Sequence, residues 1–228
     1  MLVNEDSRHH SPHVRAYGWL LVASAAMIVF GMLHHPTVSA TNTSSLLESL
    51  AAQSQSISRL HGVLLVIALV QVTGFYGLTR ALGGERPLPA TGLIFFGMAT
   101  IAMTNAAAIN GFAAPDFAAA MLSRRPEEVA AAATVLRMNW ALNQAFDLIG
   151  AVGWSIAILC WSAALLRHPG LPRWVGTVGL VGGTALGAAL MAGAIRFDAA
   201  GFTLTIALLS LWTLAVAALM VTGRIHER

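Results

Sequence analysis

Hydrophobic residues occur along this chain in six long stretches, separated by shorter polar or turn-rich segments. The stretches cover approximately residues 16–35, 61–82, 89–110, 141–166, 174–196 and 202–223. A helix needs roughly 20 apolar residues to cross the hydrocarbon core of a bilayer, and each stretch is about that long. The pattern therefore predicts an all-α integral membrane protein. We expect a flexible cytoplasmic tail at residues 1–15 and one domain at residues 16–228, a bundle of six transmembrane helices.

Two of the polar segments are long and have the composition of helices rather than loops. Residues 41–62 contain no Pro or Gly before Gly62, and Ser45 followed by Glu48 predicts a capping box. In SRRPEEV, Pro126 is placed for the first turn of a helix, with two acids behind it. A third short helix is expected to begin at Pro115. We therefore expect spans two and four to extend beyond the bilayer as a small helical cap.

Composition excludes a soluble domain, because only 10% of the residues are charged and 57% are hydrophobic, whereas soluble proteins have about 25% charged residues. All 13 basic residues are arginine. They gather at span ends, so the basic balance indicates a lipid bilayer as partner and no nucleic acid. If both termini are cytoplasmic, eight arginines fall inside and five on the longer outside segments, as the positive-inside rule requires. The composition, rich in Ala and Arg, is typical of a bacterial cell inner membrane protein.

Polar residues inside the spans share one depth. Asn139, Asn143 and Asp147 recur every four residues and form one stripe on a helix. At about 1.5 Å per residue from the cytoplasmic end of each span, polar groups from five spans converge near the outer edge of the membrane. The other members of this layer are His34, His35, His61, Asn105, Asn110 and Arg196. Ionisable groups at such depth usually face a cavity, which predicts an outward-facing polar pocket.

The pocket suggests roles for its members. Asp147 is the candidate charged anchor, proton carrier or, in an enzyme, catalytic acid or base paired with Asn143. The candidate ligand-binding residues are Asn139, Asn143, Asn110, Asn105 and Arg196. The alternative is an ion pair between Asp147 and Arg196 or Arg137 that only fixes the packing of the spans.

Histidines at the same depth suggest a metal site. His34 or His35, with His61 and Asp147, would supply nitrogen and oxygen ligands suited to zinc, copper or iron. A single b-type haem between one of the adjacent histidines and His61 is a second option. The chain has no HExxH or HxH motif, and the alternative is that these histidines cap helix ends and form hydrogen bonds.

Gly179, Gly183 and Gly187 recur every four residues in span five, which is typical of a close helix–helix contact. The contact is expected within the chain, with Gly150 and Gly153 of span four on the facing surface. Alternatively, the glycine face binds a second copy of the chain or a larger membrane complex.

These features favour a membrane-embedded binding or accessory protein for a small polar ligand or a metal ion. The alternatives are an intramembrane enzyme, a small-solute transporter and a subunit of a membrane complex. The enzyme would be a metal-dependent hydrolase or an acid–base catalyst acting on a lipid-like or isoprenoid substrate.

Overall fold

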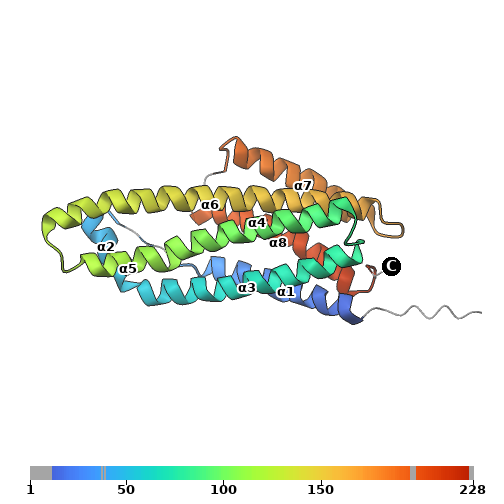
Figure 1. The fold of residues 1–228 in the computed structure, drawn as a ribbon, viewed down its shortest axis with the longest axis horizontal. Coiled ribbons are helices and arrows are strands. Elements are labelled where there is room, and N and C mark those ends of the chain that lie inside the picture. Colours follow the sequence, from blue (N-terminus) through green and yellow to red (C-terminus); the bar gives the residue numbers. More distant parts are fainter. Residues whose placement is uncertain (1–11, 37, 39, 196–198, 226–228) are drawn as a thin grey trace, which may run out of the picture.

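The computed structural model describes residues 12–36, 38, 40–195 and 199–225, and these residues form an all-helical protein (Figure 1). Six helical segments are long and apolar enough to cross a membrane, which confirms the predicted number. In chain order the elements are α1 (Pro12–Leu33), α2 (Thr43–Ala52), α3 (Ser54–Ala81), α4 (Pro87–Ala108), the π-helical turn η1 (Ile109–Ala113), α5 (Ala114–Met121), α6 (Pro126–Leu166), α7 (Arg173–Met191) and α8 (Ala199–Val221).

The first helix begins four residues earlier than expected. Because α1 starts at Pro12, the last four residues of the expected flexible tail are helical; residues 1–11 lie outside the described part of the chain. Arg15 donates a hydrogen bond from Nε to the carbonyl oxygen of Val221, over 3.0 Å, and so links the start of α1 to the end of α8. Both described ends therefore lie at the same end of the bundle (Figure 1).

At the other end of the bundle, short helices form a cluster that we call the cap, and its position outside a bilayer stays a prediction. Helices α2, α5 and the first turns of α6 pack around the buried residues Leu47, Ala118, Ala132 and Leu136. The segment expected as one helix is divided at Gln53 into α2 and α3.

The predicted capping box is one turn too late. The N-cap is Asn42, whose Oδ1 accepts a hydrogen bond from the Ser45 backbone N–H over 2.9 Å. Ser45 Oγ in turn accepts from the Asn42 backbone N–H over 3.2 Å. Asn is among the strongest N-cap residues, so Asn42 takes the role that Ser45 was expected to have with Glu48.

The third expected helix is a continuation of α4 rather than a separate element. It begins at Ala114, directly after the π-helical turn, and the apolar segment runs on from Pro87 to Met121.

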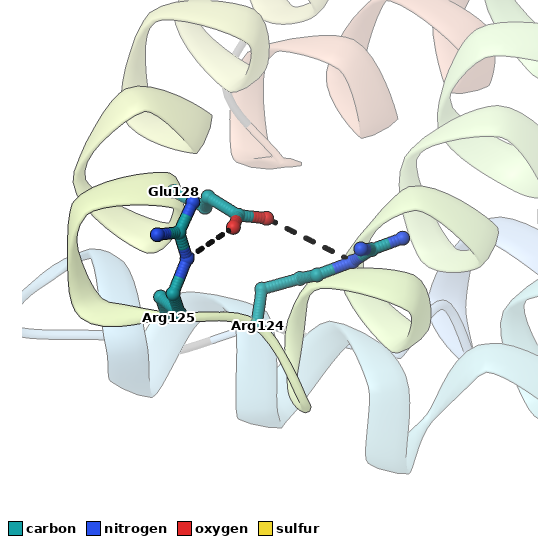
Figure 2. A network of polar contacts seen from close by, with 3 residues as sticks. All are labelled: Arg124, Arg125 and Glu128. Carbon is teal, nitrogen blue, oxygen red and sulfur yellow. Dashed lines mark hydrogen bonds and ion pairs between the residues drawn. The ribbon is translucent and has the colours of Figure 1, made fainter.

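The hairpin between α5 and α6 carries a charged cluster in which Arg125 donates from Nε to Glu128 over 2.9 Å, while the Arg124 side chain lies 3.9 Å from the other carboxylate oxygen (Figure 2). These exposed pairs contribute little stability, roughly 0.3–0.5 kcal/mol each, but they make this end of the molecule hydrophilic.

The long helices form two groups. Helix α1 packs along both α3 and α8, and α6 packs along both α4 and α7, whereas α8 has few contacts with α6 and α7. An aromatic cluster joins the groups: the rings of Phe75 and Trp161 stack with centroids 4.5 Å apart, and Trp161 and Trp212 stack at 6.3 Å. The Trp161 indole donates a hydrogen bond to Thr79 Oγ1 over 3.0 Å. This cluster holds α3, α6 and α8 together near the end that carries both described termini.

The glycine face of α7 packs within the chain. A Cβ atom at Gly179 would lie 2.0 Å from Ser162 Oγ of α6, and one at Gly183 would lie 3.3 Å from the Ser155 carbonyl oxygen of the same helix. Gly187 is next to Ser155 as well. Gly179 and Gly183 therefore face α6, as expected for a contact within the chain, and binding of a second copy or of a larger complex stays a prediction.

The predicted partner glycines of α6 face another helix. Gly150 lies against Met103, and Gly153 lies against Ala99, both in α4. The expectation that Gly150 and Gly153 meet α7 is therefore wrong. Gly150 and Gly153 allow α6 to approach α4 on one side, and the glycines of α7 allow the approach of α7 on the other.

Candidate functional site

A cavity of about 660 Å³ lies between the two groups of helices. Helices α1, α3, α4, α6 and α8 form its sides, and Leu46 and Leu50 of α2 cover its cap end. Most of its wall is apolar. The amide, acid and imidazole side chains on the wall are His35, His61, Gln71, Asn110, Asn139, Asn143, Gln144 and Asp147.

Six of the residues predicted for the site therefore line one cavity, and two described ones, Asn105 and His34, do not. Asn105 is exposed on α4 and donates from Nδ2 to the Ile101 carbonyl oxygen of its own helix over 2.8 Å. His34 is exposed beyond the end of α1, where its ring packs on Phe30 with centroids 4.1 Å apart. Arg196 lies outside the described residues. The inclusion of Asn105 and His34 in the pocket is thus corrected.

Helix geometry explains why Asn105 points away. Residues five apart on an α-helix differ by about 140° in direction, so Asn105 and Asn110 cannot both face the cavity. Asn139, Asn143 and Asp147 are four apart, and all three line it.

Asp147 and Asn143 form a buried pair. The Asn143 amide donates from Nδ2 to Asp147 Oδ2 over 2.7 Å, and the two side chains are 5% and 7% exposed respectively. The alternative of an ion pair with Arg137 is wrong, because Arg137 is exposed and donates to the Ala133 carbonyl oxygen of its own helix. Asp147 thus lies in an apolar wall with an amide as its hydrogen-bond partner.

The π-helical turn positions His61. A Cβ atom on Gly111 would lie 2.4 Å from both Cβ and Cγ of His61, so only glycine allows this approach. Ser58, one turn before His61, donates from Oγ to the Gly111 carbonyl oxygen over 2.8 Å. π-Helical turns insert an extra residue into a helix and occur frequently at functional sites. Here the turn brings α4 and α3 together at the level of the histidine.

The two cavity histidines contact each other. The rings of His35 and His61 are arranged edge to face, with centroids 5.2 Å apart. His61 Nδ1 donates to the Ile57 carbonyl oxygen, and His35 Nδ1 to the Pro36 carbonyl oxygen, each over 2.9 Å. A nitrogen that donates to a carbonyl carries the proton, so Nε2 of each ring is the acceptor in the neutral form.

This arrangement does not support the expected metal or haem site. Among the described residues, no group of three or more His, Cys, Asp and Glu side chains could hold a metal ion. The haem option requires a porphyrin between two histidines, and the direct contact of the His35 and His61 rings leaves no space for one.

Three buried polar atoms on the cavity wall have no hydrogen-bond partner within the described part of the protein. They are the donors Gln71 Nε2 and Trp154 Nε1 and the acceptor Asn143 Oδ1. A buried polar atom that stays unpaired costs about 1–3 kcal/mol, and these three atoms belong to side chains that line the cavity. Trp154 is not among the residues predicted for the site. Its position two turns after Asp147, on the same helix face, is the sequence signal that identifies it.

A second cavity, of about 600 Å³, lies between α6, α7 and α8. Its wall includes Gly182, Val178, Leu208 and Leu211 and has no amide, acid or imidazole side chain among the described residues. The Trp212 indole also lies on this wall, and its Nε1 has no hydrogen-bond partner among the described residues, but the wall has fewer polar side chains than that of the first cavity.

Comparisons of this chain with protein-family models, with curated proteins and with solved structures find no match. The interpretation of the first cavity depends on its own geometry.

Proposed function

We propose that this chain is a multi-pass protein of the bacterial inner membrane that binds a small ligand in the cavity between its two helix groups. Both termini face the cytoplasm, and the cap faces outward. The distribution of arginines supports this orientation, and so does the hydrophilic hairpin at Arg124, Arg125 and Glu128. The cavity then lies toward the outer side of the membrane.

The observation that carries the proposal is the set of unpaired polar atoms in an apolar cavity of ligand size. Ligand sites usually measure about 300–1,000 Å³, with mostly apolar walls and a few polar groups that fix orientation. The cavity volume of about 660 Å³ falls within this range. Gln71 and Trp154 offer donors and Asn143 offers an acceptor, so a ligand that pairs with them removes an existing cost.

Asp147 is the anchor of the site in this proposal, and Asn143 orients it by donating to its carboxylate. His61 contributes Nε2 as an acceptor, held in place by the Ile57 carbonyl oxygen. Asn110 and Asn139, both half-buried, add amides closer to solvent.

An intramembrane enzyme is the second candidate, because a carboxyl group and two imidazoles line the same cavity. Its acid–base residue would be Asp147, acting on a lipid-like substrate. Turnover by the wild type that Asp147→Asn abolishes, with ligand binding retained, would distinguish catalysis from binding alone.

The binding proposal is tested on purified protein in lipid nanodiscs. The probes are short-chain alcohols, amides and amines at millimolar concentration, and the readout is the unfolding temperature. A ligand that binds only the folded state stabilises it by RT ln(1 + [L]/Kd), about 2.7 kcal/mol at one hundred times Kd. We expect at least one probe class to stabilise the wild type, and we expect Asn143→Leu to remove that effect. The matched control is Asn105→Leu, which changes an exposed amide outside the cavity. Equal responses of both variants and the wild type would overturn the proposal.

The orientation is tested by cysteine labelling in a Cys160→Ala background. A membrane-impermeant maleimide should label Ser123→Cys, in the hairpin before α6, in intact spheroplasts. It should label Glu85→Cys, between α3 and α4, only after permeabilisation. The reverse pattern would show that the cap faces the cytoplasm.

A further inference from the structure

Large apolar side chains are exposed to the outside at one end of the cavity wall, which we call the mouth. The most exposed of the large side chains on its wall are Leu33 at 68% and Trp140 at 64%. They come from the end of α1 and from α6, and the half-buried Phe202 from the start of α8 lies on the same wall. Helices α6 and α8, which carry Trp140 and Phe202, have few contacts with each other.

The cavity is long and narrow. From Trp140 at the mouth to Trp154 at the inner end is fourteen residues along α6, or about 21 Å. A volume of about 660 Å³ over this length corresponds to an average cross-section on the order of 30 Å². These dimensions suit a chain-like molecule better than a compact solute.

The inner end of the cavity carries two unpaired hydrogen-bond donors. The unpaired donors Gln71 Nε2 and Trp154 Nε1 are at this end, and both side chains are at least nine-tenths buried. The unpaired acceptor Asn143 Oδ1 and the Asp147 carboxyl group lie two to three turns nearer the mouth along α6. This order of groups matches a ligand head that both accepts and donates hydrogen bonds. Its accepting oxygen would lie innermost, next to the two donors, and its donor would lie nearer the mouth, next to the acceptors.

The charge of the wall selects an uncharged head. No Lys or Arg is among the described residues that line the cavity, and Asp147 is the acid there. An anionic head would approach the carboxyl group without a basic side chain to pair with. A cationic head would meet the inner donors Gln71 and Trp154, which present hydrogen atoms to it.

From these features we infer that the ligand is an uncharged amphiphile with one apolar chain, which enters head first from the bilayer. Its oxygen-bearing head reaches Gln71 and Trp154, and its chain leaves past Leu33 and Trp140 into lipid. This inference rests on the proposed function and narrows it from a small polar ligand to a membrane-dissolved one.

Photoaffinity labelling in nanodiscs tests the inference. The probes are dodecan-1-ol, dodecanoate and dodecyltrimethylammonium, each with a diazirine at the chain end, and a diazirine-bearing butanol that lacks the long chain. We expect the dodecanol probe to label peptides that contain Leu33 or Trp140. Gln71→Leu and Trp154→Phe should each weaken this labelling roughly tenfold, the loss expected for one hydrogen bond to a buried donor. Trp19→Phe, a change at an exposed tryptophan away from both cavities, is the matched control.

Each of the other possible results refutes a specific part of the inference or of the proposed function. If the butanol probe labels cavity peptides and dodecanol does not, the amphiphile inference fails while the proposed function stands. Equal labelling by the charged probes refutes the uncharged head. If no probe labels cavity peptides, or labelling is unchanged in Gln71→Leu, Trp154→Phe and Asn143→Leu, both the inference and the proposed function fail.

Discussion

Gly111→Ala tests the contact that positions His61. The new methyl carbon would lie 2.4 Å from His61 Cβ and Cγ, whereas carbon atoms normally approach to about 3.5–4.0 Å. A flexible side chain could rotate away, but Cβ is fixed to the backbone of α3. The two helices must therefore separate by about 1 Å, which also strains the hydrogen bond from Ser58 to the Gly111 carbonyl oxygen.

The expected cost follows from two opposing effects. Replacing glycine by alanine within a helix gains up to about 1 kcal/mol, and overpacking a well-packed contact costs about 1–3 kcal/mol. Because His61 cannot yield, we expect a net loss of about 1–2 kcal/mol of unfolding free energy. Gly97→Ala on the same helix is the matched control: nothing lies within 4 Å of its added Cβ, so it should be neutral or stabilising.

The measurement is the unfolding of both variants in detergent, followed by tryptophan fluorescence, together with binding of the probe that stabilises the wild type. One kcal/mol corresponds to about 2–4 °C in a protein of this size, so Gly111→Ala should unfold several degrees below Gly97→Ala and bind more weakly. If the two variants unfold at the same temperature with unchanged binding, the close packing of His61 on the π-helical turn is refuted.

Three further predictions concern the framework of the bundle. Gly179→Ala should destabilise the protein by about 1–3 kcal/mol in thermal unfolding, because its Cβ would overlap Ser162 and Trp212, whereas Gly182→Ala, with open space around it, should not. Thr79→Val should cost about 1–3 kcal/mol of unfolding free energy by leaving the Trp161 indole unpaired. If Thr79→Val costs the same free energy in a Trp161→Phe background, which has no indole to pair, this reason is refuted. Asn42→Ala should remove the N-cap of α2 at a cost of about 1 kcal/mol, seen as faster amide hydrogen exchange in α2 and unchanged exchange in α7.

Hydrophobic pattern alone predicts the six long helices, because a run of about 20 apolar residues has few other stable states. It does not predict where they end when a tertiary contact decides. Span three was expected to end at Asn110, and the following Gly111 is a typical helix terminator. The helix continues to Met121 because Ser58 pairs with the Gly111 carbonyl oxygen and His61 packs on the glycine. Neither partner is near in sequence.

The candidate site shows the same limit. Counting residues along each span gives the height of a polar group but not the direction in which its side chain points. Asn105 and Asn110 have similar heights and face different surroundings, and so do His34 and His35. On α6 the interval of four residues fixes direction as well as height, so the stripe of Asn139, Asn143 and Asp147 could be predicted correctly.

The packing of the bundle explains where the cavity forms. Large aromatic side chains, with Phe75, Trp161 and Trp212 at their centre, fill the space between the helix groups near the termini. Toward the cap, the facing positions hold amides and an acid, which cannot pack as densely unless each finds a partner. The groups are joined again at the cap and at the contact of His61 with Gly111, and α3 also packs against α4.

Stability alone does not account for these polar residues. Asn143 and Asp147 satisfy part of each other's hydrogen-bonding capacity. Gln71 and Trp154, in contrast, leave donors unpaired at buried positions where leucine or phenylalanine would bury no polar atom. Local departures from good packing are expected at functional sites and are offset elsewhere in the fold. Here the aromatic cluster at one end and the cap at the other stabilise the bundle around a cavity whose unpaired polar residues lower the stability of the fold. On this reasoning, Gln71→Leu and Trp154→Phe should leave the protein as stable as the wild type or more so in the absence of ligand, and they should weaken binding.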